Sequence, residues 1–354
     1  MNESAKREYL GSRAVSVPLT VIALIAGVWA LRTAYVVFLP LACSLYLAVL
    51  VRPLQDKIRR RLPRRLRWLS LLLTFLVGVG VAALLVGLIW IALALLQRKA
   101  PPYIDAIKAH WQTLVAWTGD QGLPLQENLD RFTGMIERLL GFVTSTVVSL
   151  WSVIALIVLV FFLTILLLLE WNEWRQKARQ AASGSRSTRI LDAIDNISKK
   201  IRSFLVVRTV LSLISGLATG LWLWAAGVEL AFVWGLLTFI LNYIPSLGSI
   251  ISVVAPTIFA LVQLGLWRAV IALAGMIVIE QIVAGLIEPR MQGRAVRLSP
   301  FIVLMSLVFW GWVWGIVGML LAVPLTVTFV VICSEIDSLE WLAEIMGRSG
   351  GEKV

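Results

Sequence analysis

A carboxyl group stands in the middle of a long apolar stretch of this chain. Glu280 occurs in MIVIEQIVAG, with Gln281 beside it and apolar or small residues on both sides. Burying a lone charge at the centre of a membrane-length helix costs about 2.5 kcal/mol or more, so such a residue should face a wet path or a partner. On a path, Glu280 could bind polar groups or carry a proton. The structural alternative is an ion pair with Arg208, which lies on an earlier apolar segment.

A second polar group surrounds a break in an apolar stretch. The sequence LNYIPSLGS contains Pro245 and Gly248, which interrupt the helical pattern. Its polar side chains include those of Asn242, Ser246 and Ser249. In membrane proteins, unwound backbone and the ends of half-helices supply hydrogen-bond donors and acceptors for solutes. The segment therefore predicts a site for a small polar solute, and a packing kink satisfied within the protein is the alternative.

Glycines and tryptophans crowd a third segment, residues 301–333. Gly311, Gly315 and Gly318 divide FWGWVWGIVGMLLAVP, and Pro324 follows them. Small residues at this spacing can let helices approach closely. Breaks of this kind also occur where the backbone lines a cavity rather than facing lipid. Helix packing and a gate both remain open as interpretations of this segment.

The remaining residues exclude several classes of protein. The chain has one histidine, His110, and two cysteines, Cys43 and Cys333, which lie in apolar runs. This composition excludes a multi-histidine metal centre and offers no disulfide framework. Gly78-x-Gly80 has no phosphate-binding context, so it is not a nucleotide motif. We therefore expect no enzyme, no metal and no cofactor.

The elements that must position these residues are membrane helices. Apolar residues make up 59% of the chain, whereas a soluble globular chain has about 45–50%. Apolar runs of about 20 residues recur, enough to cross a hydrocarbon core of about 30 Å. The runs are continuous rather than alternating, which disfavours a β-barrel. We therefore predict an all-α polytopic transmembrane protein in the lipid bilayer, with Gly216 and Gly220 packing one helix closely on another.

Basic residues cluster in short loops and orient the helices. The net charge is +12, but residues 52–67 and 170–202 hold eight Lys or Arg each, as cytoplasmic loops do. Nucleic-acid binding is therefore not expected. We also expect a short N-terminal helical hairpin with Arg32 at its outer turn. The predicted organisation is N-terminal membrane helices with a basic loop (1–97), an extracytoplasmic segment (98–145), a membrane helix with an amphipathic linker (146–202), a C-terminal core (203–334) and a cytoplasmic tail (335–354).

Two apolar stretches are too long for one straight span. Residues 230–264 follow an outward helix, whereas the basic loop 290–297 should lie inside. The first stretch must therefore begin and end outside, as a broken, re-entrant hairpin with its turn near Pro245. Residues 301–333 would enter from inside as a second hairpin. Such a pair resembles the inverted repeats of membrane proteins that bind solutes at the midplane, with a site where the tips meet.

Three C-terminal segments resemble a known family. They are NYIPSLGS (242–249), IEPRMQGRAVRLSP (287–300) and SLVFWGWVWGIVGMLLAVPLT (306–326), and they resemble the autoinducer-2 exporter family of bacterial membrane proteins, or PerM-like permeases. The resemblance implies about eight membrane segments, cytoplasmic termini, the bacterial inner membrane and a homo-oligomer, with a pentamer expected. The matching motif positions are Pro245, Gly248, Pro289, Gly293, Pro300, Gly311, Gly315, Gly318 and Pro324.

Three functional hypotheses follow. The first is export of a small polar solute, which the resemblance identifies as autoinducer-2, with the two hairpins as gates. The expected pathway residues are Asn242, Ser246, Ser249, Glu280 and Gln281. The second is sodium- or proton-coupled antiport through Glu280, since other family members are associated with that exchange. The third is a non-transporting scaffold whose extracytoplasmic segment binds a partner.

Overall fold

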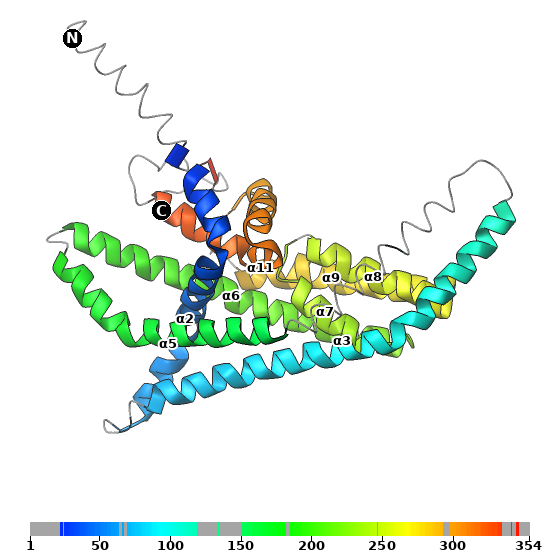
Figure 1. The fold of residues 1–354 in the computed structure, drawn as a ribbon, viewed down its shortest axis with the longest axis horizontal. Helices are drawn as coiled ribbons and strands as arrows, with labels where there is room; N and C mark the ends of the chain where they lie inside the picture. The colour runs from blue at the N-terminus through cyan, green and yellow to red at the C-terminus, as the bar shows by residue number, and fades with distance from the viewer. Residues whose placement is uncertain are drawn as a thin grey trace, which may run out of the picture.

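The chain folds into helices that pack side by side (Figure 1). The computed structural model describes residues 22–23, 25–63, 66, 69–118, 134, 150–181, 185–245, 247–292, 298–334, 341 and 345–346. In chain order the elements are α2 (Tyr35–Arg61), α3 (Leu69–Thr118), α5 (Leu150–Ala181), α6 (Ser185–Ala225), α7 (Ala231–Leu241), α8 (Leu247–Leu264), α9 (Leu266–Ile282), the π-helix η2 (Val283–Ile287), α10 (Glu288–Gln292) and α11 (Pro300–Ser334). The predicted all-α class is confirmed.

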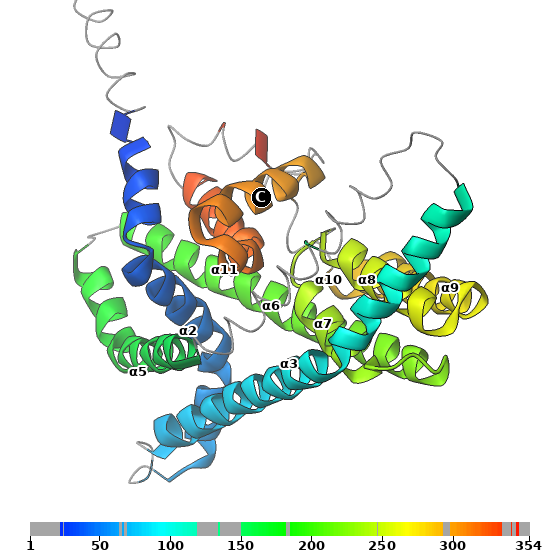
Figure 2. The ribbon, with the colours of Figure 1, turned by 45° about the vertical axis from the view of Figure 1, so that its right-hand side comes forward.

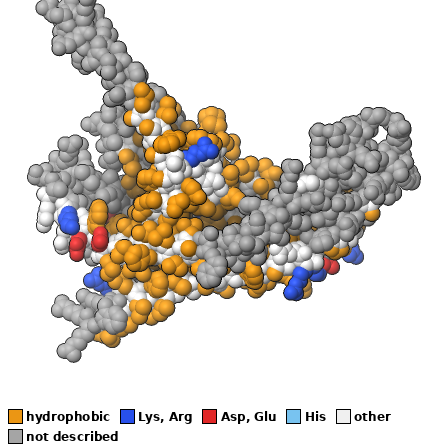
Figure 3. Space-filling view, viewed as in Figure 1, with side chains coloured by type: hydrophobic (Ala, Val, Ile, Leu, Met, Phe, Trp, Pro, Cys, Tyr) orange, Lys and Arg blue, Asp and Glu red, His pale blue; other side chains and the backbone are white. Residues whose placement is uncertain are grey.

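Seven candidate membrane spans are present among the described residues, judged by helix length and composition. They are Tyr35–Arg61, Leu69–Lys99, Ile154–Trp171, Asp195–Ala225, Leu247–Leu264, Leu266–Met291 and Pro300–Ser334. Helix α7 is apolar but has 11 residues, a length of about 16 Å that is too short to cross a core of about 30 Å. Figure 3 shows hydrophobic side chains over much of the described face. The polytopic membrane architecture is therefore confirmed.

The N-terminal segment continues into α2 instead of forming the expected hairpin. The Ala34 N–H donates to the Ala30 carbonyl at 2.8 Å, and the Phe38 N–H donates to the Ala34 carbonyl at 3.1 Å. The chain kinks at Ala34 (φ −94°, ψ 33°) and then continues into α2, so the prediction of an outer turn at Arg32 was wrong. The Arg32 guanidinium lies 4.3 Å from the ring centroid of Trp312. That cation–π contact stabilises the charge of Arg32, which is itself exposed.

Helices α6 to α9 form a bundle that holds the residues of interest. Helix α6 packs against α7 and α9, and α8 packs against the same two helices. Figures 1 and 2 show the four helices gathered together beside the long α3. A Cβ at Gly216 would lie 2.8 Å from the Gly235 carbonyl oxygen, and a Cβ at Gly235 would lie 3.0 Å from the Gly220 Cα. The predicted packing role of the two α6 glycines is confirmed, and α7 is the partner.

Candidate functional site

The first hairpin consists of α7, the turn after it and α8. Its two arms fold back on each other, because the Trp234 and Phe259 ring centroids lie 5.5 Å apart across them. At the turn, a Cβ on Gly248 would lie 1.8 Å from the Leu241 carbonyl oxygen. Only glycine fits that approach, so the break predicted at Pro245 and Gly248 is a tight fold-back of the chain.

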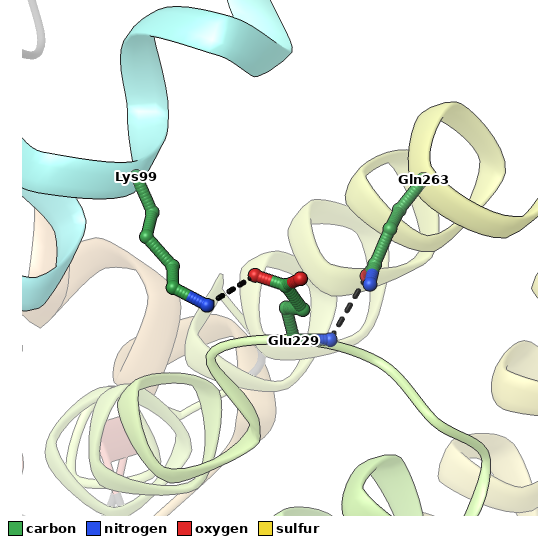
Figure 4. Close-up of polar contacts among 3 residues, drawn as sticks. All are labelled: Lys99, Glu229 and Gln263. Carbon is green, nitrogen blue, oxygen red and sulfur yellow. Dashed lines mark hydrogen bonds and ion pairs between the residues drawn. The ribbon is translucent and has the colours of Figure 1, made fainter.

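The open end of the first hairpin is tied to α3. Figure 4 shows the Lys99 ammonium pairing with the Glu229 carboxylate, in the loop that precedes α7. The Glu229 backbone N–H donates to Gln263 Oε1 of α8 at 2.9 Å. Both charged side chains are partly exposed, at 47% and 42%, so solvent weakens the pair. This contact therefore fixes where the open end of the hairpin lies but adds little to the free energy of unfolding.

The second hairpin lies within α11. Trp314 and Gly315 leave the helical conformation, and Gly315 has φ 63° and ψ −144°, a region that favours glycine. The chain then folds back, because a Cβ on Gly318 would lie 2.0 Å from the Trp310 carbonyl oxygen. The Trp310 indole N–H also donates to Thr326 Oγ1 at 3.3 Å. The predicted break is thus a two-residue turn between two antiparallel arms.

The tips of the two hairpins pack against different neighbours. Ile244, at the first turn, belongs to one buried cluster with Leu307 and Ala322, on opposite arms of the second hairpin. At the second turn, the Trp314 indole N–H donates to the Leu31 carbonyl at 3.0 Å. The first tip therefore lies on the flank of the second hairpin. The second tip lies on the helical residues 25–33 that precede α2, called the N-terminal helix below. This differs from the tip-to-tip meeting expected from the sequence.

Glu280 is bonded to the first hairpin. The Ser249 hydroxyl, on the first turn of α8, donates to Glu280 Oε1 on α9. Two predicted pathway residues, 31 positions apart in the chain, are thus brought together. Since a serine hydroxyl can donate to a carboxylate or accept from a carboxylic acid, the contact can persist in either protonation state. Substitution of Glu280, or a new hydrogen bond to its carboxylate, would therefore alter the contact that holds the turn of the first hairpin.

A buried ion pair lies beside this contact. Arg208 of α6 is only 5% exposed, and its Nη1 donates to Glu288 Oε1 at 3.1 Å. Its guanidinium also interacts electrostatically with Glu280. The structural partner considered for Glu280 is therefore bonded to Glu288, a residue that the sequence analysis did not select. The signal that could have found it is a second carboxylate at the end of the same apolar run.

The π-helix explains how Glu280 and Glu288 come to face the same guanidinium, although only Glu288 is bonded to it. Eight residues rotate about 800° in an ideal α-helix, about 80° past two full turns. Val283–Ile287 form η2 between Glu280 and Glu288, and the wider π turn rotates less per residue. The rotation falls toward two full turns, so both carboxylates face the side on which Arg208 lies. Sequence periodicity does not reveal such a turn.

Some of the other predicted residues are buried within the protein, and others are exposed on its surface. Asn242 is buried, whereas Gln281 is exposed and lies away from the network. Pro289 is exposed, Pro300 begins α11 and Pro324 is buried in the second arm of the second hairpin. Ser246 and Gly293 lie outside the described residues.

A neighbouring contact at the first turn was missed from the sequence. The Tyr243 hydroxyl donates to Thr209 Oγ1 of α6 at 2.7 Å. Tyr243 stands in the NYIPSLGS segment, but its aromatic ring suited a packing role equally well. With Ser249 and Glu280, it makes a turn held by hydroxyl groups on two sides.

The sequence was compared with known proteins. The pattern of the AI-2E family transporters matches residues 19–337. The "AI-2 transport protein TqsA" of Escherichia coli (strain K12) is 34% identical over 309 residues, covering 84% of this chain and 85% of the relative. A "Putative transport protein" of Haemophilus influenzae (strain ATCC 51907 / DSM 11121 / KW20 / Rd) is 30% identical over 317 residues, covering 86% and 88%. "Putative transport protein YhhT" of Escherichia coli (strain K12) is 40% identical over 128 residues, covering 36% and 37%.

Proposed function

The chain belongs to the AI-2E transporter family, and we propose that it exports a small polar solute, autoinducer-2, through the α6–α9 bundle. It is a multi-pass membrane transporter and not an enzyme. The choice of solute draws on the E. coli relative whose name specifies AI-2 transport. The proposal includes the bacterial inner membrane, cytoplasmic termini and a homo-oligomer.

One observation carries this proposal. Ser249, at the turn of the first hairpin, donates to Glu280 of α9, next to the Arg208–Glu288 pair. Hydroxyl groups of a solute could replace the serine at the Glu280 carboxylate, since a carboxylate accepts from any such donor. Breaking the serine contact would release the turn of the hairpin. Solute binding and hairpin movement are therefore coupled through one hydrogen bond.

The two hairpins act as the gates in this proposal. Each is a re-entrant element, the first entering from the outer face and the second from the cytoplasmic face. Support comes from the short α7 arm of 11 residues and from the Gly315 turn. Broken helices of this kind line solute paths in secondary transporters. The first tip packs on the flank of the second hairpin, so movement of one would displace the other.

The test is the ratio of internal to external autoinducer-2 in a producing strain that lacks its own copy of this chain. The wild-type chain should lower the ratio, and Glu280→Gln and Ser249→Ala should each fail to lower it fully. Thr257→Val is the matched control, because that hydroxyl on α8 donates to the Val253 carbonyl of its own helix at 2.7 Å. An unchanged ratio with intact wild-type protein in the membrane would contradict autoinducer-2 export.

A second candidate is sodium- or proton-coupled antiport through Glu280. Among the described residues, the Glu280 and Glu288 carboxylates lie near one guanidinium, and Arg208 is bonded to Glu288. In this candidate a proton or a sodium ion balances the charge at Glu280, since an unbalanced charge inside a membrane is costly. Glu280→Gln separates the candidates in vesicles: ion exchange should vanish in the variant, whereas uncoupled solute efflux should survive in part.

A further inference from the structure

Helix α6 carries a buried polar stripe beyond the contacts described so far. Arg208, Ser212, Ser215 and Thr219 follow each other at helical spacing, and none is more than 5% exposed. At about 100° per residue they fall within an arc of about 60°. They therefore form one polar line along the helix, beginning at the guanidinium that binds Glu288.

Three polar atoms of this stripe have no hydrogen-bond partner among the residues that the structure describes. They are Ser212 Oγ, Ser215 Oγ and Arg208 Nε. Several hydroxyls elsewhere on the described helices donate to their own backbone, as Thr238 does to the Trp234 carbonyl at 2.9 Å. Buried polar atoms in folded proteins rarely lack a partner. The two serine hydroxyls therefore need a partner that the described residues do not supply.

The stripe faces the interior of the α6–α9 bundle. On one side of it, Leu211 packs with Val283 of η2 in an apolar cluster. On the other side, Gly216 touches Gly235 of α7. The serine hydroxyls lie between these two contacts, fully buried. They are thus placed within the bundle, along the line that leads from the Arg208–Glu288 pair.

The chemistry of the stripe selects one class of ligand. The Arg208 Nε–H donates, serine hydroxyls both donate and accept, and the Glu280 and Glu288 carboxylates near the guanidinium accept. A hydroxyl group meets each of these partners, whereas an anion would be repelled by the two carboxylates. We infer that Ser212, Ser215 and Arg208 Nε bind the hydroxyl groups of a small neutral polyhydroxylated solute. The inference rests on the proposed function and extends it to residues on α6.

The experiment measures the thermal stabilisation of the detergent-purified full chain by autoinducer-2. The double variant Ser212→Ala/Ser215→Ala should need roughly tenfold or more solute for the same shift, because two hydrogen bonds are lost. Ser306→Ala is the matched control, since that buried hydroxyl donates to the Val303 carbonyl at 2.7 Å. Without solute, the double variant should melt no lower than the wild type, because neither hydroxyl has a partner to lose.

Each result has one meaning. A wild-type response in the double variant overturns the inference and leaves the proposed function standing. A wild type that does not respond to autoinducer-2 contradicts the proposed function, and this inference falls with it. If the double variant fails to fold, Ser212→Cys in a Cys43→Ser/Cys333→Ser background replaces it. A small water-soluble thiol reagent should then label the cysteine at position 212 but not the cysteine of a Leu211→Cys variant. Autoinducer-2 should slow the labelling at position 212. Equal labelling at both positions overturns the inference.

Discussion

The two hairpins share a folded-back shape but are held by different contacts. At the first turn, Tyr243 donates to Thr209 of α6 and Ser249 donates to Glu280 of α9. At the second turn, the Trp314 indole donates to a backbone carbonyl of the N-terminal helix. A hydroxylated solute can exchange with the serine at a carboxylate, whereas the indole–carbonyl bond offers no such charged acceptor. On the proposed function, we therefore expect the first hairpin to be the one that responds to the solute, and the second to be held by the N-terminal helix.

The largest expected effect comes from filling the tight turn of the first hairpin. Gly248→Ala would place a Cβ 1.8 Å from the Leu241 carbonyl oxygen, so the backbone itself must move. We expect a loss of about 3 kcal/mol or more in unfolding free energy, at the upper end for overpacking. Thermal unfolding in detergent measures it. Gly80→Ala is the control, since nothing lies within 4 Å of a Cβ there; equal melting of the two variants would mean that the turn is not close-packed.

The second largest loss of stability should come from removing the buried guanidinium of Arg208. Arg208→Leu leaves Glu288 without the guanidinium 3.1 Å away. Breaking a buried pair costs about 3–5 kcal/mol, and the lower end applies because the Glu288 side chain is 28% exposed.

The partner substitution makes that prediction specific to the pair. The double variant Arg208→Leu/Glu288→Leu should recover part of the stability, because Glu288 no longer leaves a charge without its guanidinium, whereas the Glu280 carboxylate remains. Thermal unfolding of the two single variants and the double variant provides the measurement. If the double variant is no more stable than Arg208→Leu, the unpaired Glu288 charge is not what destabilises the single variant.

The second hairpin should tolerate substitution at its turn better than the first. Gly315 has φ 63°, but nothing lies within 4 Å of a Cβ there. Gly315→Ala therefore costs only the backbone strain, about 2 kcal/mol. Asparagine should not rescue it, because ψ −144° lies outside the left-handed helical region that asparagine accepts. A Gly315→Ala variant less stable than Gly248→Ala would reverse the comparison.

Local signals in the sequence predicted much of the site. Proline and glycine mark both breaks, since each changes what the backbone can do at its own position. A carboxylate amid apolar residues similarly predicted that Glu280 would have a polar partner, and Ser249 provides it.

What the sequence did not predict depends on distant contacts. Glu288 ends the apolar run and resembles a loop residue, until η2 turns it toward Arg208. The outer turn at Arg32 was wrong for the same reason, since Trp312 lies 280 residues later in the chain (312 minus 32) and stabilises that charge. Single-sequence patterns do not contain information on partners that lie so far apart in the chain.

The contact between Arg32 and Trp312 gives the smallest expected effect and tests how the second hairpin is held. The guanidinium lies 4.3 Å from the ring centroid, but Trp312 is 53% exposed, so the pair should contribute about 0.5–1 kcal/mol. A double-mutant cycle with Arg32→Gln and Trp312→Leu isolates that coupling from the loss of each side chain alone. Lys57→Gln on α2, exposed and basic like Arg32, should show no coupling to Trp312→Leu. Zero coupling for Arg32 as well would mean that the cation–π contact does not hold the second turn, and the Trp314 indole would then be its polar contact with the N-terminal helix.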